Sequence, residues 1–138
     1  MATFEIGNTE IVEQAYRQLG DDFGEIALEM LEKSAPILAD EVKRNLPSEI
    51  SKYSSNVYIS TPKKWKNDKY GILINFSGTT PRSKDNLRNA ELMAYWEYGS
   101  SKNPATGFMR KSVKNSKNEV QNKMADIAKK KLEEAFGR

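Results

Sequence analysis

The sequence contains no cysteine and no histidine. The missing cysteines exclude disulfide bonds, thiolate nucleophiles and sulfur-based zinc sites. The missing histidines exclude the Ser-His-Asp arrangement and every other histidine-based acid–base mechanism. The chain also lacks an apolar run of about 18 residues, the length that a membrane span needs, and its N-terminus does not resemble a signal peptide. These absences predict a protein made in a reducing cytoplasm, with no membrane partner and few of the usual catalytic groups.

The residues that are present predict one domain over residues 1–138. Hydrophobic residues make up 38% and charged residues 30%, which is enough apolar material for one modest core. The charge is unevenly distributed: residues 1–50 carry a net −7 and residues 51–138 a net +10. Such a division suits contact with nucleic acid, head-to-tail contact with a second copy, or simple solvation of both halves.

Two helical patterns occupy the N-terminal part. Residues 9–19 predict a short amphipathic helix, and apolar residues at helical spacing predict a longer one from Phe23 to Leu46. Pro36 lies inside the longer pattern, so we expect a kink or a local interruption there. Pro47 ends the pattern because the residue before a proline is driven away from helical geometry.

The apolar period changes in the middle of the chain. Residues 56–60 and 70–76 alternate like strands, which predicts an antiparallel hairpin with its turn at Asn67-Asp68 and Trp65 on the incoming arm. Residues 77–84 are predicted to form a polar loop.

Two further helices are expected after this loop. A short one covers residues 85–98 and stops at Gly99, and a long, lysine-rich one covers residues 109–136. The predicted class is therefore α+β, with a small antiparallel β-hairpin or sheet packed against a long kinked N-terminal helix, a short central helix and a long C-terminal helix.

No group of residues predicts catalysis. The adjacent carboxylates at 21–22, 40–41 and 133–134 are interpreted as capping or solvated groups, because none has the spacing of a calcium loop or a two-metal site. The glycines are isolated and form no phosphate-binding loop. We therefore expect no enzyme activity, no cofactor and no metal.

Two lysine clusters raise the alternative of a small basic nucleic-acid-binding module. Lys63-Lys64-Trp65-Lys66 sets an aromatic ring among ammonium groups, and Lys129-Lys130-Lys131 adds a second basic patch. The competing interpretation is that Trp65 packs under the hairpin while the lysines protect a sheet edge and a helix end. No known reader motif accompanies either cluster.

The most informative stretch runs from Ala94 to Arg110, AYWEYGSSKNPATGFMR. It combines an aromatic-rich helix end, a glycine stop, a proline turn and the apolar pair Phe108-Met109. Tyr95, Trp96 and Tyr98 cannot all be buried on one face, so at least one is expected at an interface. The segment from Glu97 to Arg110 resembles the signature of the tail-component family of HK-type siphophages, which comprises gene-product-ten-like morphogenesis proteins of tailed phages and prophages. The order of the other predicted elements is similar to that family along nearly the whole chain.

The resemblance implies a structural role in head–tail joining or tail completion. It implies assembly as a homo-oligomeric ring, contacts with other phage neck and tail proteins, a place in the virion after synthesis in the bacterial host cytoplasm, and no catalysis. No catalytic residue is carried over from the family. We expect the loop that shapes a subunit interface to be fixed by Trp96, Tyr98, Phe108 and Arg110. The unequal charges of the two halves would then pair between neighbouring subunits, or the basic residues would make non-specific contact with DNA.

Overall fold

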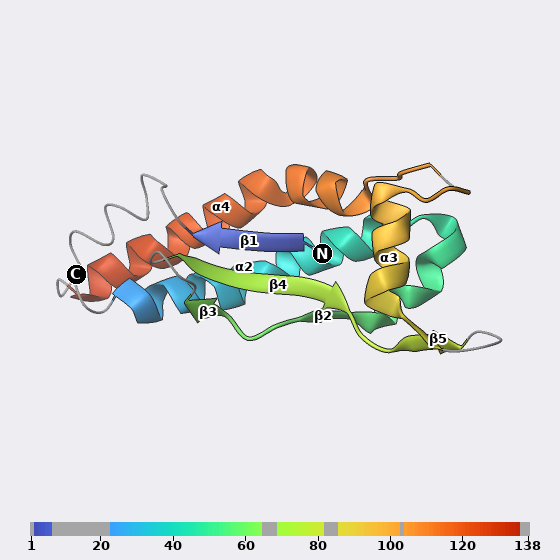
Figure 1. Ribbon diagram of the computed structural model, residues 1–138. Coiled ribbons are helices and arrows are strands. Elements are labelled where there is room, and N and C mark those ends of the chain that lie inside the picture. Colours follow the sequence, from blue (N-terminus) through green and yellow to red (C-terminus); the bar gives the residue numbers. More distant parts are fainter. Residues whose placement is uncertain (1, 7–22, 65–68, 82–85, 103, 136–138) are drawn as a thin grey trace.

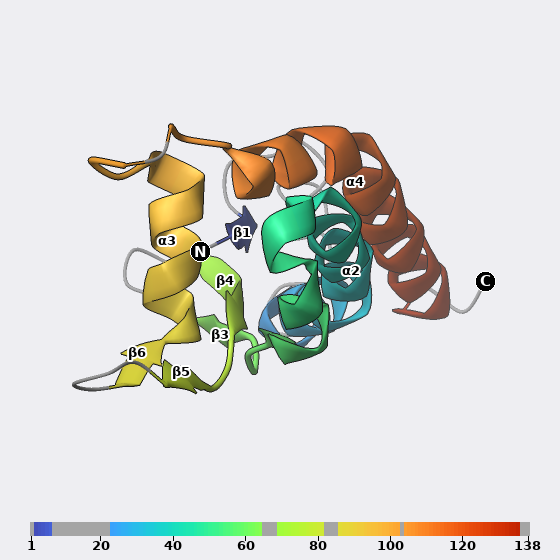
Figure 2. The ribbon, with the colours of Figure 1, turned by 90° about the vertical axis from the view of Figure 1, so that its right-hand side faces the viewer.

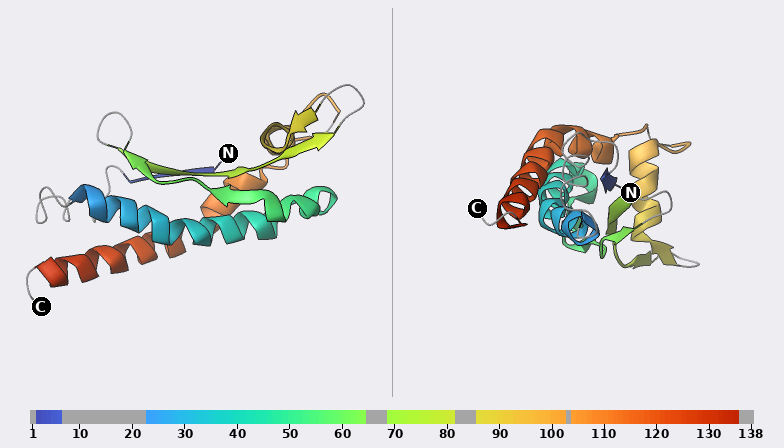
Figure 3. Two further views of the ribbon diagram at one scale, coloured as in Figure 1. Left: turned by 90° about the horizontal axis from the view of Figure 1, so that it is seen from below. Right: turned by 90° about the vertical axis from the view of Figure 1, so that its left-hand side faces the viewer.

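A computed structural model describes residues 2–6, 23–64, 69–81, 86–102 and 104–135. Two long helices, α2 (Phe23–Asn45) and α4 (Phe108–Ala135), run antiparallel side by side (Figure 1). Helix α2 lies between the C-terminal half of α4 and a small antiparallel sheet (Figure 3), whereas the start of α4 contacts the sheet through Phe108. The short helix α3 (Asn89–Tyr98) crosses one end of the molecule (Figure 2). The predicted α+β arrangement is confirmed. The expected helix at 9–19, the turn at 67–68, Trp65 and Phe136 lie outside the described residues.

Helix α2 forms the middle layer because it is apolar on two sides. Its buried positions cover an arc far wider than the roughly 100° stripe of a helix with one covered face; they are Ile26, Ala27, Met30, Leu31, Ser34, Ala35, Leu38, Ala39 and Val42. The helix continues through Pro36, so the predicted interruption is absent, and its axis bends at mid-helix in Figure 3. Pro36 removes the hydrogen bond to the carbonyl of Glu32, and both residues are exposed, so water can satisfy that carbonyl.

Strand β4 (Tyr70–Phe76) is the centre of the sheet, whose strand order is β1-β4-β2. Tyr70, Ile72, Ile74 and Phe76 are all buried in the core, as the alternation predicts. The strand pairs with β1 (Ala2–Ile6) on one side, and with β2 (Val57–Ile59) and β3 (Lys63–Lys64) on the other.

The arm that contains β2 and β3 carries one extra residue relative to β4. The register shifts from Ile59↔Ile74 in β2 to Lys63↔Gly71 in β3, so four steps on one strand match three on the other. The Ser60 hydroxyl accepts the Leu73 N–H at 2.9 Å, and the Ser60 N–H donates to the Leu73 carbonyl at 2.8 Å. The serine side chain thus replaces a backbone carbonyl in the ladder at this bulge.

Two parts of the sheet structure differ from the sequence predictions. The sequence predicted no helix or strand for residues 2–6, but they form β1. Residues Ala2, Phe4 and Ile6 lie opposite buried residues of β4 in the strand register. A strand this short forms only beside such a partner. The predicted polar loop at 77–84 instead contains β5 (Thr79–Pro81), which pairs with β6 (Asn86–Arg88).

Helix α3 begins at Asn89 rather than at Asp85 because Asn89 is tied to this second hairpin. The buried Asn89 amide donates to the Ser77 carbonyl at 2.8 Å and accepts the Thr80 hydroxyl at 2.6 Å. The Asn89 N–H also donates to the Gly78 carbonyl at 3.0 Å. Residues 86–88 are therefore held as a strand, and the helix starts behind them.

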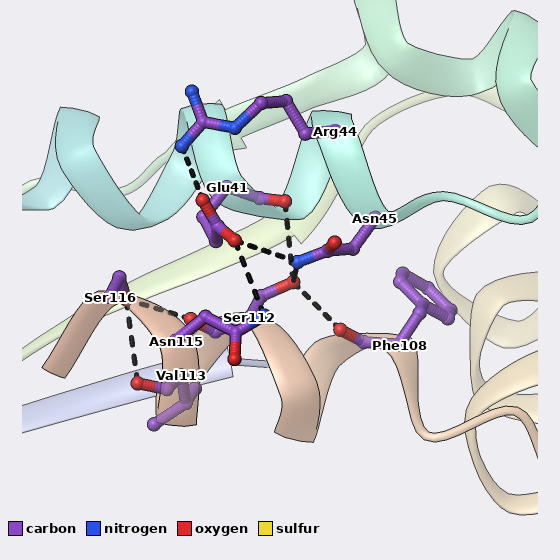
Figure 4. Close-up of polar contacts among 8 residues, drawn as sticks. All are labelled: Glu41, Arg44, Asn45, Phe108, Ser112, Val113, Asn115 and Ser116. Carbon is purple, nitrogen blue, oxygen red and sulfur yellow. Dashed lines mark hydrogen bonds and ion pairs between the residues drawn. The ribbon is translucent and has the colours of Figure 1, made fainter.

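A polar cluster joins the C-terminal end of α2 to the N-terminal half of α4 (Figure 4). The Asn45 amide donates to the Ser112 hydroxyl and to Glu41 Oε1, both at 3.1 Å, and Asn115 donates to the same carboxylate oxygen at 3.4 Å. Arg44 pairs with the other oxygen of Glu41. The Ser112 and Ser116 hydroxyls donate to the carbonyls of Phe108 and Ser112 one turn back. The short serine side chains let the two helices approach closely.

Candidate functional site: the loop between α3 and α4

The segment that carries the family resemblance forms the end of α3, a loop described over residues 99–102 and 104–107, and the start of α4. Gly99 ends α3 with φ 90°, a left-handed conformation that suits glycine, and its N–H donates to the Tyr95 carbonyl at 2.8 Å. The loop extends beyond the body of the molecule where α3 meets α4 (Figures 1 and 2). Gly99 is thus the helix stop that the sequence predicted.

Glu97 fastens the base of this loop. Its side chain is 1% exposed, and its carboxylate accepts the Met109 N–H at 2.8 Å and the Arg110 N–H at 3.3 Å. Arg110 Nε lies 3.6 Å from the same carboxylate. The first turn of α4 has no acidic residue of its own, so Glu97 supplies the negative charge and the acceptors that a helix N-terminus requires. One side chain therefore caps α4 and joins it to α3.

A second set of hydrogen bonds closes the loop at the same place. The Thr106 N–H and hydroxyl both reach the Trp96 carbonyl, at 2.9 and 2.7 Å, and the Gly107 N–H donates to the Glu97 carbonyl at 3.1 Å. Gly107 has φ 63°, the second position in this segment where the left-handed conformation favours glycine. The two ends of the loop are thereby held together, as in compact surface loops that carry function.

The four predicted interface residues lie in different environments. Phe108 is 2% exposed and makes an edge-to-face contact with Phe76, with ring centroids 6.3 Å apart. Trp96 is half-buried against the core. Tyr98 is 66% exposed, and Arg110 is exposed except for its contact with Glu97. The loop is thus held by core packing of Phe108 and Trp96 and by the contact of Arg110 with Glu97, whereas Tyr98 is exposed to solvent.

Tyr95 accompanies Tyr98 on the outer side of α3. Tyr95 is 50% exposed, and the two residues are three positions apart, which makes them neighbours on a helix surface. Sequence reasoning expected at least one exposed aromatic residue here, and the structure shows two. Exposed tyrosines beside a firmly anchored loop form a surface that can bind another protein, because tyrosine contributes a large contact area at low entropic cost.

Sequence reasoning missed the capping role of Glu97. Two signals pointed to it: Glu97 shares the helical line of Ala90 and Met93, which faces the core, and the following long helix lacks an acidic first turn. Neither signal shows by itself that the carboxylate of one helix reaches the backbone of the next. Only the folded loop brings them together.

The lysine clusters of the nucleic-acid alternative lie on different layers. Lys63 and Lys64 are exposed on β3, while the turns of α4 that hold residues 129–131 lie on the other side of α2 (Figure 3). Lys131 is already paired, with Glu29 Oε2 at 3.4 Å and Glu134 Oε2 at 3.6 Å, and its hydrogen bond to Glu29 raises its pKa. The described parts of these two clusters therefore do not form one continuous basic surface.

The described residues contain no cluster of three or more acidic side chains able to hold a metal ion. No helix in the described ranges is both long and apolar enough to cross a bilayer.

Comparisons of the chain with protein-family models, with curated proteins and with solved structures found no match. The family resemblance of the Glu97–Arg110 segment therefore stays a prediction.

Proposed function

We propose that this chain is a structural morphogenesis protein of a tailed phage or prophage. It acts at the head–tail junction, as a neck or tail-completion component, by assembling into a homo-oligomeric ring and binding neighbouring neck and tail proteins, without catalysis. The proposal rests on the resemblance carried by residues 97–110. The observation that supports it is that this segment forms a loop fastened at its base by the buried Glu97 carboxylate.

Within the segment, some residues hold the loop in position and others are available to contact a partner. Glu97, Trp96 and Phe108 hold the loop in one position, and Tyr95 and Tyr98 face solvent beside it. A subunit interface needs such pre-positioned anchors, because ordering a loose loop on binding would oppose assembly. In the proposed ring, the two tyrosines contact the adjacent subunit or the next ring of the neck.

The test is to count this protein in purified particles. The source phage or lysogen, with the gene deleted, is complemented with the wild-type chain, and virions are analysed by quantitative mass spectrometry. A few to about a dozen copies per particle is expected for one closed ring. Absence from complete particles, with abundant protein in the lysate, would overturn the proposal.

Matched variants locate the interface. Tyr95→Ala combined with Tyr98→Ala should fold normally but enter particles poorly, because both side chains are exposed. Tyr58→Ala is the control, since Tyr58 is 42% exposed but lies on β2, away from the loop. If the control lowers incorporation as much as the double variant does, the tyrosines of α3 are not the anchors.

The alternative function is a small basic nucleic-acid-binding module. Its discriminating measurement is affinity for generic duplex DNA as salt is raised, because phosphate contacts weaken steeply with salt. Negligible binding at low salt would remove this alternative, whereas strong and salt-sensitive binding by a chain that is absent from virions would favour it.

A further inference from the structure

The strongest uniform charge among the described residues lies on the N-terminal half of α4. Residues 108–118 contain four cations and no acidic residue, a net +4, whereas residues 119–135 contain four of each sign, a net 0. The four cations are Arg110, Lys111, Lys114 and Lys117, and all are exposed. We call these four residues the basic face. It is distinct from both lysine clusters singled out in the sequence.

The basic face lies on one side of the helix. At 3.6 residues per turn, its four members fall within an arc of about 120°, and Lys111, Lys114 and Lys117 follow one another at about 4.5 Å along the axis. Asn118 and Gln121, which are also exposed, continue the same arc and add neutral hydrogen-bond donors. A polyanion lying along this side would meet only cations and amides.

The lysines of the basic face carry free charge. No ion pair within 4.0 Å involves Lys111, Lys114 or Lys117 in the part of the chain that the structure describes; only Arg110 has a partner, Glu97. The nearby Arg44 of α2 is neutralised by Glu41. Free exposed lysines are available for a ligand, whereas paired cations such as Lys131 are not.

The position of the basic face is unfavourable for the stability of α4. Cations are unfavourable near a helix N-terminus, and like charges three or four residues apart repel each other, as in the pairs 110–114, 111–114 and 114–117. Lys111, Lys114 and Lys117 therefore cost stability and form no ion pair among the described residues, which indicates that they serve a contact with a ligand.

We infer that the basic face is a contact surface for the phosphate backbone of duplex DNA. Lysine carries its ammonium group on a flexible four-carbon stem, so the three exposed lysines along this side of the helix can each reach a phosphate. An acidic face of a second copy fits less well: the described part of the opposite end mixes Glu25, Glu29 and Glu32 with Lys33, Lys129 and Lys130 and offers no uniform acidic patch. The contact is independent of base sequence, because lysines to phosphates carry no readout.

The test compares two triple variants of the same helix. Lys111→Gln/Lys114→Gln/Lys117→Gln removes the lysines of the basic face, and Lys123→Gln/Lys129→Gln/Lys130→Gln removes three exposed lysines from the other half. Both lower the net charge from +3 to 0. Binding to a generic 30-base-pair duplex is measured from 50 to 200 mM salt, and circular dichroism checks that each variant is folded.

The wild-type chain is expected to lose about 40-fold in affinity over this range, as three neutralised phosphates require. The face triple, Lys111→Gln/Lys114→Gln/Lys117→Gln, should flatten the slope of log affinity against log salt by about 2.7, and the control triple by less than about 1. Equal flattening by both triples, or no wild-type binding at 50 mM salt, would overturn the inference. A different outcome is that the wild-type chain self-associates at low salt, with the face triple abolishing this association and leaving DNA binding unchanged. That result would overturn the inference and identify a second copy of the chain as the ligand of the basic face.

This inference goes beyond the proposed function and can fail separately from it. DNA binding through the basic face by a chain that never enters particles would overturn the virion role alone. A virion component whose face triple binds DNA as well as the wild-type chain does would overturn the inference alone.

Discussion

The two halves of α4 differ in how their charges are balanced. In residues 119–135, cations and carboxylates alternate, and Lys131 bridges to Glu29 on the neighbouring helix. In residues 108–118, every charge is positive, and the carboxylates that contact this half come from other elements: Glu97 of α3 accepts the Met109 N–H, and Glu41 of α2 accepts from Asn115. The first half thus depends on carboxylates of other elements for its electrostatic balance, whereas the second half contains as many carboxylates as cations. The difference shows that charge balance within one helix can be local in one half and supplied by other elements in the other half.

The largest expected effect is a loss of stability on removing Phe108, the buried apolar residue at the start of the first half of α4. Phe108→Ala should lower the free energy of unfolding by about 3–5 kcal/mol, because it empties a buried site against Phe76. Tyr98→Ala, ten residues earlier and exposed, should change it by less than about 0.5 kcal/mol. Urea unfolding measures both. Similar losses for the two variants would mean that the loop is not anchored by Phe108.

The next effect concerns the cap. Glu97→Gln keeps the shape of the side chain, but it removes the negative charge that faces Arg110 and replaces one of the two oxygens that accept the Met109 and Arg110 N–H groups with an amide NH2. We therefore expect the free energy of unfolding to fall by about 2–3 kcal/mol. The control is Glu91→Gln on the same helix. It breaks the exposed pair with Arg88 and removes an acidic residue from the first turn of α3, and it should cost less than about 1 kcal/mol. Hydrogen exchange gives a second readout: the Met109 and Arg110 amides should lose protection in the Glu97 variant only.

The charge comparison between the halves can be sharpened by two smaller changes. Lys111→Gln/Lys114→Gln should raise the free energy of unfolding by about 0.5–1 kcal/mol, because it relieves repulsion and an unfavourable dipole interaction. Lys129→Gln/Lys130→Gln should leave it unchanged or lower it slightly, because Asp126 and Glu133 lie at favourable i±4 positions to these lysines. If the melting temperatures of the two double variants shift equally, the two halves of α4 do not differ in how their lysines affect stability.

The smallest effect is a pH dependence of stability at the polar contact between α2 and the first half of α4. The hydrogen bond from Arg44 holds the pKa of Glu41 below its ordinary value of 4.5. Glu41 is therefore more stabilising when ionised, and its contribution, present at neutral pH, is lost as the pH falls through its lowered pKa. Stability curves from pH 6 to 3 should show Glu41→Gln losing less on acidification than the wild-type chain, by less than about 1 kcal/mol.

Glu32→Gln is the control for this measurement, since Glu32 is exposed and has no ion pair among the described residues. Its acid profile should follow that of the wild-type chain. If the Glu41 variant instead loses as much stability in acid as the control does, the pairing with Arg44 contributes nothing measurable.

Sequence periodicity determined the elements with long, regular burial patterns. The helices now seen at Phe23–Asn45 and Phe108–Ala135, and the strand at Tyr70–Phe76, follow from apolar spacing alone, because one helix face or one strand face repeats many times. The Gly99 stop also follows locally, because only a few residues favour its φ. These features depend on the chain within a few residues of each position.

Tertiary structure decided the rest, because each remaining feature joins residues far apart in the chain. Strand β1 forms on β4 about seventy residues away, and residues 79–81 become a strand only when 86–88 lie beside them. Glu97 caps α4 only when the loop folds back. Likewise, only the packing of the helices determines which cations of α4 have a carboxylate partner and which do not. A sequence pattern records which residues are present; the pairing of distant charges and backbone groups is determined by the fold.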